Sequence, residues 1–140
     1  MGLFSIVGNF LDSVFSFLVG LVAGLIATAI AAVGLVIELF ADILDWVEDC
    51  LDDLLDEGCT EVNVIMGNAF SDYLGKEKAA GNVREVSIED LRKIKNSVIN
   101  VANNEVDVHK IQMITSDNGV SNETVARFEG KPIMKIKIAQ

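Results

Sequence analysis

The chain has 140 residues, enough for one ordinary domain, and its single proline and 11 glycines are too few for a linker-rich chain. Its net charge of −10 comes from the first 58 residues, which carry ten acidic side chains and no lysine or arginine, because acids and bases balance in the remainder. This distribution disfavours nucleic acid as a partner, since phosphate binding needs clustered cations.

An uncharged stretch runs from Ser13 to Ile37, between Asp12 and Glu38. As a helix it would be about 38 Å long, more than the roughly 30 Å hydrocarbon core of a bilayer. The sequence therefore predicts one helix, or two nearly collinear ones, from about residue 10 to 57. Its apolar part is long enough for a transmembrane span, or for burial in an all-apolar helix bundle. Without flanking lysine or arginine, its orientation in a membrane is open.

Small residues recur along this stretch at helical spacing. One row repeats every four residues and a second row lies beside it; together the candidate self-association residues are Ser16, Gly20, Ala23, Gly24, Ala27, Thr28, Ala31 and Ala32. Such rows let two helix backbones approach closely. The pattern predicts a self-association face, and the alternative is a lone membrane anchor whose small residues are incidental.

An acidic amphipathic pattern follows from Glu38 to Glu57. Apolar residues at three-and-four spacing predict a buried stripe, and the opposite face carries Asp45, Glu48, Asp49, Asp52, Asp53 and Asp56. This face is interpreted as solvated; the alternatives are a ring of carboxylates at a pore mouth or a docking surface for a basic protein partner. Trp46 is either an interface anchor at headgroup level or a packing residue. Acids at a helix C-terminus oppose its dipole, so packing or a cationic partner must offset their cost.

Residues 59–140 predict a small α+β domain with an antiparallel sheet. Strands are expected at 60–66, 82–87 and 108–116, and a short helix at about 70–78. Ser87 is expected to cap a second helix, whose apolar face includes Leu91, Ile94, Val98 and Ile99. A turn at 116–119 precedes an expected hairpin formed by 122–129 and 132–139.

The sequence contains no arrangement typical of an enzyme. Cys50 and Cys59 are nine residues apart, and the single histidine, His109, lies far from both, so neither a zinc site nor a disulfide is predicted. We expect two free thiols, no cofactor and no catalytic residues.

The pattern indicates a structural protein that oligomerises with copies of itself through the small-residue face. It would lie in a membrane, with the lipid bilayer as a partner, or be buried in a large assembly such as a virion. Residues 1–58 would form the helix and residues 59–140 a soluble module. The alternatives are a membrane-permeabilising protein (a holin-like or toxin-like pore former, or a virion entry component) and a membrane-anchored binding domain.

Overall fold

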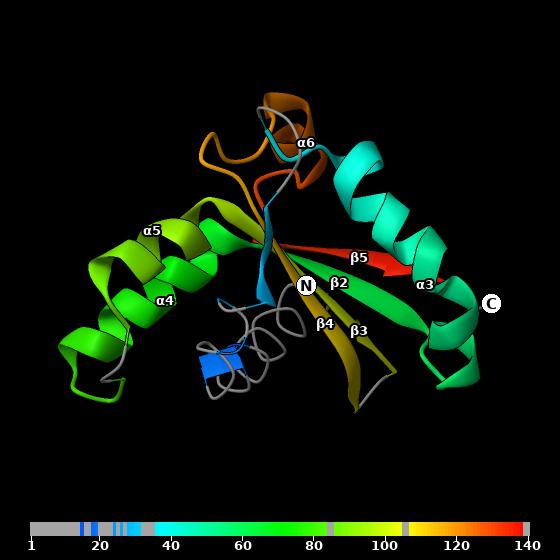
Figure 1. Ribbon diagram of the computed structural model, residues 1–140, viewed down its shortest axis with the longest axis horizontal. Helices are drawn as coiled ribbons and strands as arrows, with labels where there is room; N and C mark the ends of the chain where they lie inside the picture. Colours follow the sequence, from blue (N-terminus) through cyan, green and yellow to red (C-terminus); the bar gives the residue numbers. More distant parts are fainter. Residues whose placement is uncertain are drawn as a thin grey trace.

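The computed structural model describes residues 15, 18, 19, 24, 26, 28–31, 36–83, 86–104 and 107–138. Within them five strands form one mixed sheet in the spatial order β1-β4-β3-β2-β5, with helices on both faces (Figure 1). The strands are β1 (Ile30–Ala31), β2 (Glu61–Met66), β3 (Ser97–Asn103), β4 (Val108–Thr115) and β5 (Ile133–Lys137). The helices are a π-helical turn η1 (Leu39–Ile43), α3 (Leu44–Asp56), α4 (Gly67–Ala79), α5 (Ile88–Lys95) and α6 (Asn122–Arg127).

The sheet is mixed, so the expected antiparallel sheet is wrong. β2 pairs antiparallel with β3 and β5, and β3 pairs antiparallel with β4. β1 joins β4 in parallel, with Ile30 opposite Ile114 and Ala31 opposite Thr115. A parallel neighbour requires a long connection, and here the partner comes from a distant part of the chain.

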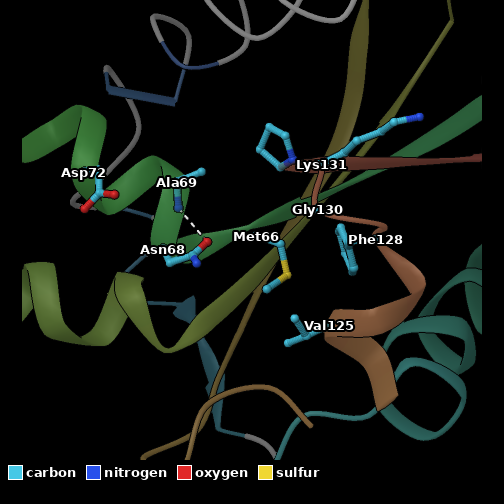
Figure 2. Close-up of a pocket in the computed structure, with 9 residues that line it drawn as sticks. Met66, Asn68, Ala69, Asp72, Val125, Phe128, Gly130 and Lys131 are labelled. Atoms are coloured by element: carbon cyan, nitrogen blue, oxygen red, sulfur yellow. Dashed lines mark hydrogen bonds between the residues drawn. The ribbon is translucent and has the colours of Figure 1, made fainter. Parts of the chain in front are cut away.

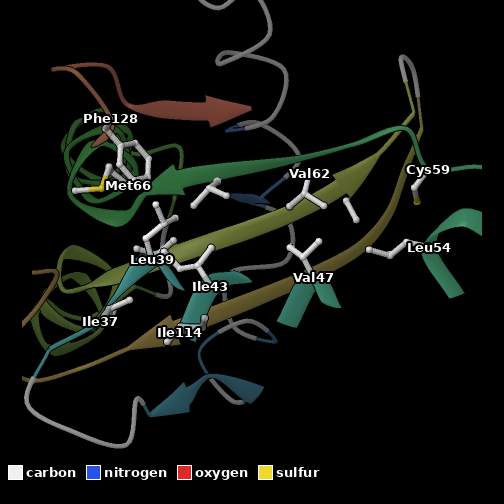
Figure 3. Close-up of a cluster of buried hydrophobic side chains, with 13 residues drawn as sticks. Ile37, Leu39, Ile43, Val47, Leu54, Cys59, Val62, Met66, Ile114 and Phe128 are labelled. Atoms are coloured by element: carbon white, nitrogen blue, oxygen red, sulfur yellow. The ribbon is translucent and has the colours of Figure 1, made fainter. Parts of the chain in front are cut away.

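Both faces of the sheet are buried, because strand side chains alternate between two cores. On one face Ile65, Ile99 and Met113 pack with residues of α4 and α5. On the other face Val62, Val64 and Val98 pack with residues of η1 and α3 (Figure 3). Every residue of the central strand β3 is therefore buried.

The expected continuous helix from residue 10 to 57 is wrong. Ile30 and Ala31 lie in a strand, and Glu38 is extended, with φ −116° and ψ 139°. The helical turn η1 begins only after Glu38, where Leu39 N donates to the buried Thr124 Oγ1 at 2.8 Å. A hydrogen bond to a distant part of the chain thus accompanies the start of η1.

The expected transmembrane helix and helix bundle are also wrong. No helix among the described residues has both the length and the apolar character that a membrane crossing needs. Phe15 and Leu18 instead belong to the core on the α4 and α5 face of the sheet, where they are 3% and 0% exposed. Apolar side chains are removed from water in a protein core as well as in lipid. Phe15 and Leu18 are removed from water by packing in the core on this face of the sheet.

Three expectations for residues 59–140 fail as well. Val98 and Ile99 lie in β3 rather than on the apolar face of the helix that Ser87 caps, because α5 ends at Lys95. Residues 82, 83, 86 and 87 lie outside any strand, and 84–85 lie outside the described residues. Residues 122–127 form α6 rather than the first strand of a hairpin, because Ser121 caps a helix by accepting from Thr124 N.

Other local expectations are confirmed. β2, α4 and β4 occupy the segments expected for them. Ser87 and Asp90 form a full capping box at the start of α5. Gly119, with φ 73°, closes the expected turn by donating from its N to Ser116 O.

Candidate functional site

The apolar segment has an inner side and an outer side. Phe15 and Leu18 are buried, and Ile26 and Ala29 pack partly against the same core. Gly24, Thr28 and Ala31 are exposed, and Ile30 is 53% exposed. The candidate self-association residues that the structure describes therefore all lie on the outer side. The other five, Ser16, Gly20, Ala23, Ala27 and Ala32, lie outside the described residues.

The outer side is open around Gly24. Gly24 and Thr28 are helical, and Thr28 Oγ1 donates to Gly24 O at 2.8 Å. A Cβ atom built on Gly24 would meet no atom within 4 Å. Because the Thr28 hydroxyl is satisfied by its own helix, it adds no unpaired donor to this surface.

The acidic face of α3 is exposed. Asp45, Glu48, Asp49, Asp52, Asp53 and Asp56 all point away from the core, whereas Ile43, Val47 and Leu54 are buried. Trp46 is partly buried and packs against the core under α3, which places it in the domain as a packing residue. The helix thus has one apolar and one negatively charged side, as its periodicity predicts.

A cavity of about 280 Å³ lies where β2 enters α4 and faces the turn between α6 and β5 (Figure 2). Met66 and Phe128 are apolar members of its wall, and Asn68, Asp72 and Lys131 are polar ones. Glu129 and Gly130 in this turn have φ values of 54° and 76°. The cavity is slightly smaller than the roughly 300–1,000 Å³ of typical ligand pockets. The opposite charges of Asp72 and Lys131 favour neither cations nor anions.

Both cysteines are free thiols, as expected. Cys59 is 1% exposed and lies beside Leu54 at the end of α3 (Figure 3). Burial, and secondarily the nearby carboxylate of Glu57, raises the pKa of the Cys59 thiol. Cys50 is partly buried, and its Sγ accepts from Lys110 Nζ at 3.5 Å.

The fold brings together three residues that the sequence does not connect. One donor atom from each of Glu57, Cys59 and His109 lies within 4.8 Å of the other two. Sequence reasoning missed this cluster because His109 is 50 residues away from Cys59 along the chain. The spacing of a zinc motif is a local signal, and this cluster depends on strand pairing.

The chain matches no protein-family model, and neither the curated proteins nor the solved structures contain a match.

Proposed function

We propose that this chain is a structural protein that assembles with copies of itself through the outer side of its apolar segment, at Gly24, Thr28, Ile30 and Ala31. The observation that carries the proposal is the exposure of these residues while the inner side of the same segment is anchored in the core. Small side chains on an anchored surface allow close backbone contact with little side-chain entropy to lose.

The position of β1 supports the same surface. β1 is an edge strand of the sheet and covers only Ile114 and Thr115 of β4. The rest of β4 has no second strand beside it among the described residues. Edge strands pair readily with another chain, so the outer side of the apolar segment adjoins a second surface suited to assembly.

The negative charge of the chain makes assembly depend on salt concentration. The exposed acidic face of α3 and the net charge of −10 make copies of the chain repel one another. The Debye length falls from about 30 Å at 0.01 M salt to about 8 Å at 0.15 M. Assembly is therefore expected to strengthen as salt is added over this range.

The test is the mass of the full chain in solution, measured by sedimentation velocity over a range of protein concentrations. Wild-type protein is expected to exceed the monomer mass of 15.1 kDa. Gly24→Leu is expected to return it to the monomer, because a large side chain would hold two copies apart. The substitution has open space around it and replaces a poor helix former, so the monomer should fold.

Gly75→Leu is the matched control, because Gly75 is a helical glycine in α4 whose Cβ would also meet no atom within 4 Å. It is expected to keep the wild-type mass. An unchanged mass for Gly24→Leu contradicts the proposal. So does a wild-type monomer that floats with phospholipid vesicles, since that outcome would make the outer side a lipid-binding surface instead.

A further inference from the structure

Glu57, Cys59 and His109 offer three different kinds of metal ligand: a carboxylate oxygen, a thiolate sulfur and an imidazole nitrogen. They come from two parts of the chain, the end of α3 and the start of β4. Their donor atoms lie within 4.8 Å of one another, and Glu57 and His109 are exposed while Cys59 is buried. The group therefore has one fixed ligand and two that can adjust.

The end of α3 positions Glu57 and Cys59. Cys59 N donates to Leu54 O at 2.9 Å and Gly58 N donates to Leu55 O at 3.1 Å, the two bonds of a Schellman motif. Gly58 takes the left-handed conformation that this motif needs, with φ 84°. The reversal of the chain at Gly58 brings the side chains before and after it to one side, close enough for both to reach one ion.

A β-bulge aims His109 at this group. Asn103 pairs with Val108 and Ala102 pairs with Lys110, so His109 is the extra residue of β4. Strict alternation would place His109 and Lys110 on opposite faces of the sheet. Both instead reach residues at α3, His109 toward Cys59 and Lys110 toward Cys50. Bulges redirect side chains in this way, frequently next to functional sites.

Asn104 is a neighbour of the His109 ring outside the cluster. Asn104 Nδ2 lies 3.1 Å from His109 Nε2, and Asn104 Oδ1 accepts from Asp107 N at 2.8 Å. Contact with an outer residue of this kind restrains the orientation of a ligating ring.

The local charge favours a cation. The C-terminal end of α3 carries the negative end of the helix dipole, its last turn contains no basic residue, and Glu57 caps it. Acids at this position are costly unless something positive compensates them. A bound divalent cation would do so.

We propose that Glu57, Cys59 and His109 form a binding site for a zinc ion. Mixed sulfur, nitrogen and oxygen donors suit Zn²⁺, which takes Cys at about 2.3 Å and His or Glu at about 2.0–2.2 Å. Tetrahedral ligands at those lengths lie about 3.5 Å apart, so the exposed side chains of Glu57 and His109 must move inward by about 1 Å. Three protein ligands leave the fourth position to water or to a group from outside.

The test is titration of the full chain, purified without metal, with Zn²⁺ and with Co²⁺. One equivalent of Zn²⁺ is expected to bind, and Co²⁺ is expected to give the ultraviolet thiolate charge-transfer band of a cobalt–cysteine bond. His109→Ala and Glu57→Gln, at exposed positions, are each expected to weaken Zn²⁺ binding at least tenfold, since outer residues alone change affinity by about 10–100-fold. Cys59→Ser is expected to abolish the cobalt band.

Two control substitutions lie in α3, the helix that precedes Glu57. Cys50→Ser and Glu48→Gln remove the other thiol and an exposed carboxylate of α3, and both are expected to leave affinity and the cobalt band unchanged. The proposal is wrong if His109→Ala binds Zn²⁺ as tightly as wild type, or if Cys50→Ser loses the cobalt band. It is also wrong if wild-type protein with a native circular dichroism spectrum gives no such band.

Discussion

Three asparagines lie inside the sheet, where amide groups are costly unless they are paired. Asn63 Nδ2 donates to Asn103 Oδ1 at 2.6 Å on the α4 and α5 face, and Asn100 Nδ2 donates to Gln112 Oε1 at 3.2 Å on the α3 face. The Oδ1 atoms of Asn63 and Asn100 accept no hydrogen bond in the part of the chain that the structure describes. A buried polar atom without a partner costs about 1–3 kcal/mol.

The two amides differ in what they leave behind, and this predicts different effects of removing them. Asn100→Val removes one unpaired oxygen and leaves Gln112, which is partly exposed and can bind water, so the free energy of unfolding should rise by about 1 kcal/mol. Asn63→Val also removes an unpaired oxygen, but it leaves the buried Asn103 Oδ1 without its donor. The gain and the cost offset each other, so the free energy of unfolding should change by less than about 1 kcal/mol. Urea unfolding of both variants measures the difference, and a larger gain for Asn63→Val than for Asn100→Val would contradict it.

At the scale of elements, the join between β2 and α4 leaves no room for a side chain. Met66 ends the strand and caps the helix, so Gly67 begins α4 with no intervening loop. A Cβ on Gly67 would lie 1.9 Å from Ile94 O and 2.6 Å from Ser97 O. Both are backbone atoms where α5 ends and β3 begins, so they cannot give way without moving those elements.

Gly67→Ala should therefore lower the free energy of unfolding by about 3 kcal/mol or more. Gly75→Ala, in the same helix, meets nothing within 4 Å and should raise it by about 0.5–1 kcal/mol, because alanine favours helix. Thermal unfolding monitored by circular dichroism compares the two. If both substitutions change the free energy of unfolding by similar amounts, the close approach of the backbone at Gly67 does not determine the effect of adding a Cβ atom there.

The elements that could be predicted are those with a local signal. β2 alternates, α5 has its capping box, and the 116–119 turn has its glycine. β3 could not be separated from α5, because Val98 and Ile99 also fit the apolar face of that helix. The sequence of α6 predicts a strand because Thr124 and Val125 are β-branched, but the Ser121 side chain caps a helix there.

The parts that could not be predicted depend on distant partners. The parallel pairing of β1 with β4 has no counterpart in the local pattern of Ile30 and Ala31. The spacing of the small residues predicts a self-association face, and the three of them that the structure describes, Gly24, Thr28 and Ala31, are exposed. The cluster around Cys59 could not be predicted, because it requires the register shift that makes His109 an extra residue.

At the scale of the whole molecule, Phe15 and Leu18 from the apolar segment belong to a core that the later part of the chain builds. The Phe15 ring lies 5.3 Å from the Phe70 ring and 5.1 Å from the Tyr73 ring, measured between centroids. The second core likewise joins α3 to the sheet. The stability of the α4 side of the sheet should therefore depend on a residue from the start of the chain.

Phe15→Ala should lower the free energy of unfolding by about 3–5 kcal/mol, the usual cost of emptying a buried aromatic site. Ile30→Ala, at a side chain that is 53% exposed, should cost less than about 1 kcal/mol and is the control. Chemical denaturation followed by tryptophan fluorescence and circular dichroism measures both. Equal small effects would mean that the apolar segment contributes little to this core.

The long-range bonds of the first forty residues also set an order of events during synthesis. Leu39 N donates to Thr124 Oγ1, 85 residues later in the chain, and Ile30 of β1 can pair with Ile114 of β4 only after Ile114 has been synthesised. A ribosome that adds about 5–20 residues per second needs about 4–17 seconds to make that intervening chain. Until that chain is made, Phe15 and Leu18 lack the core in which they are buried. During synthesis these apolar side chains are therefore open to chaperones or to neighbouring copies.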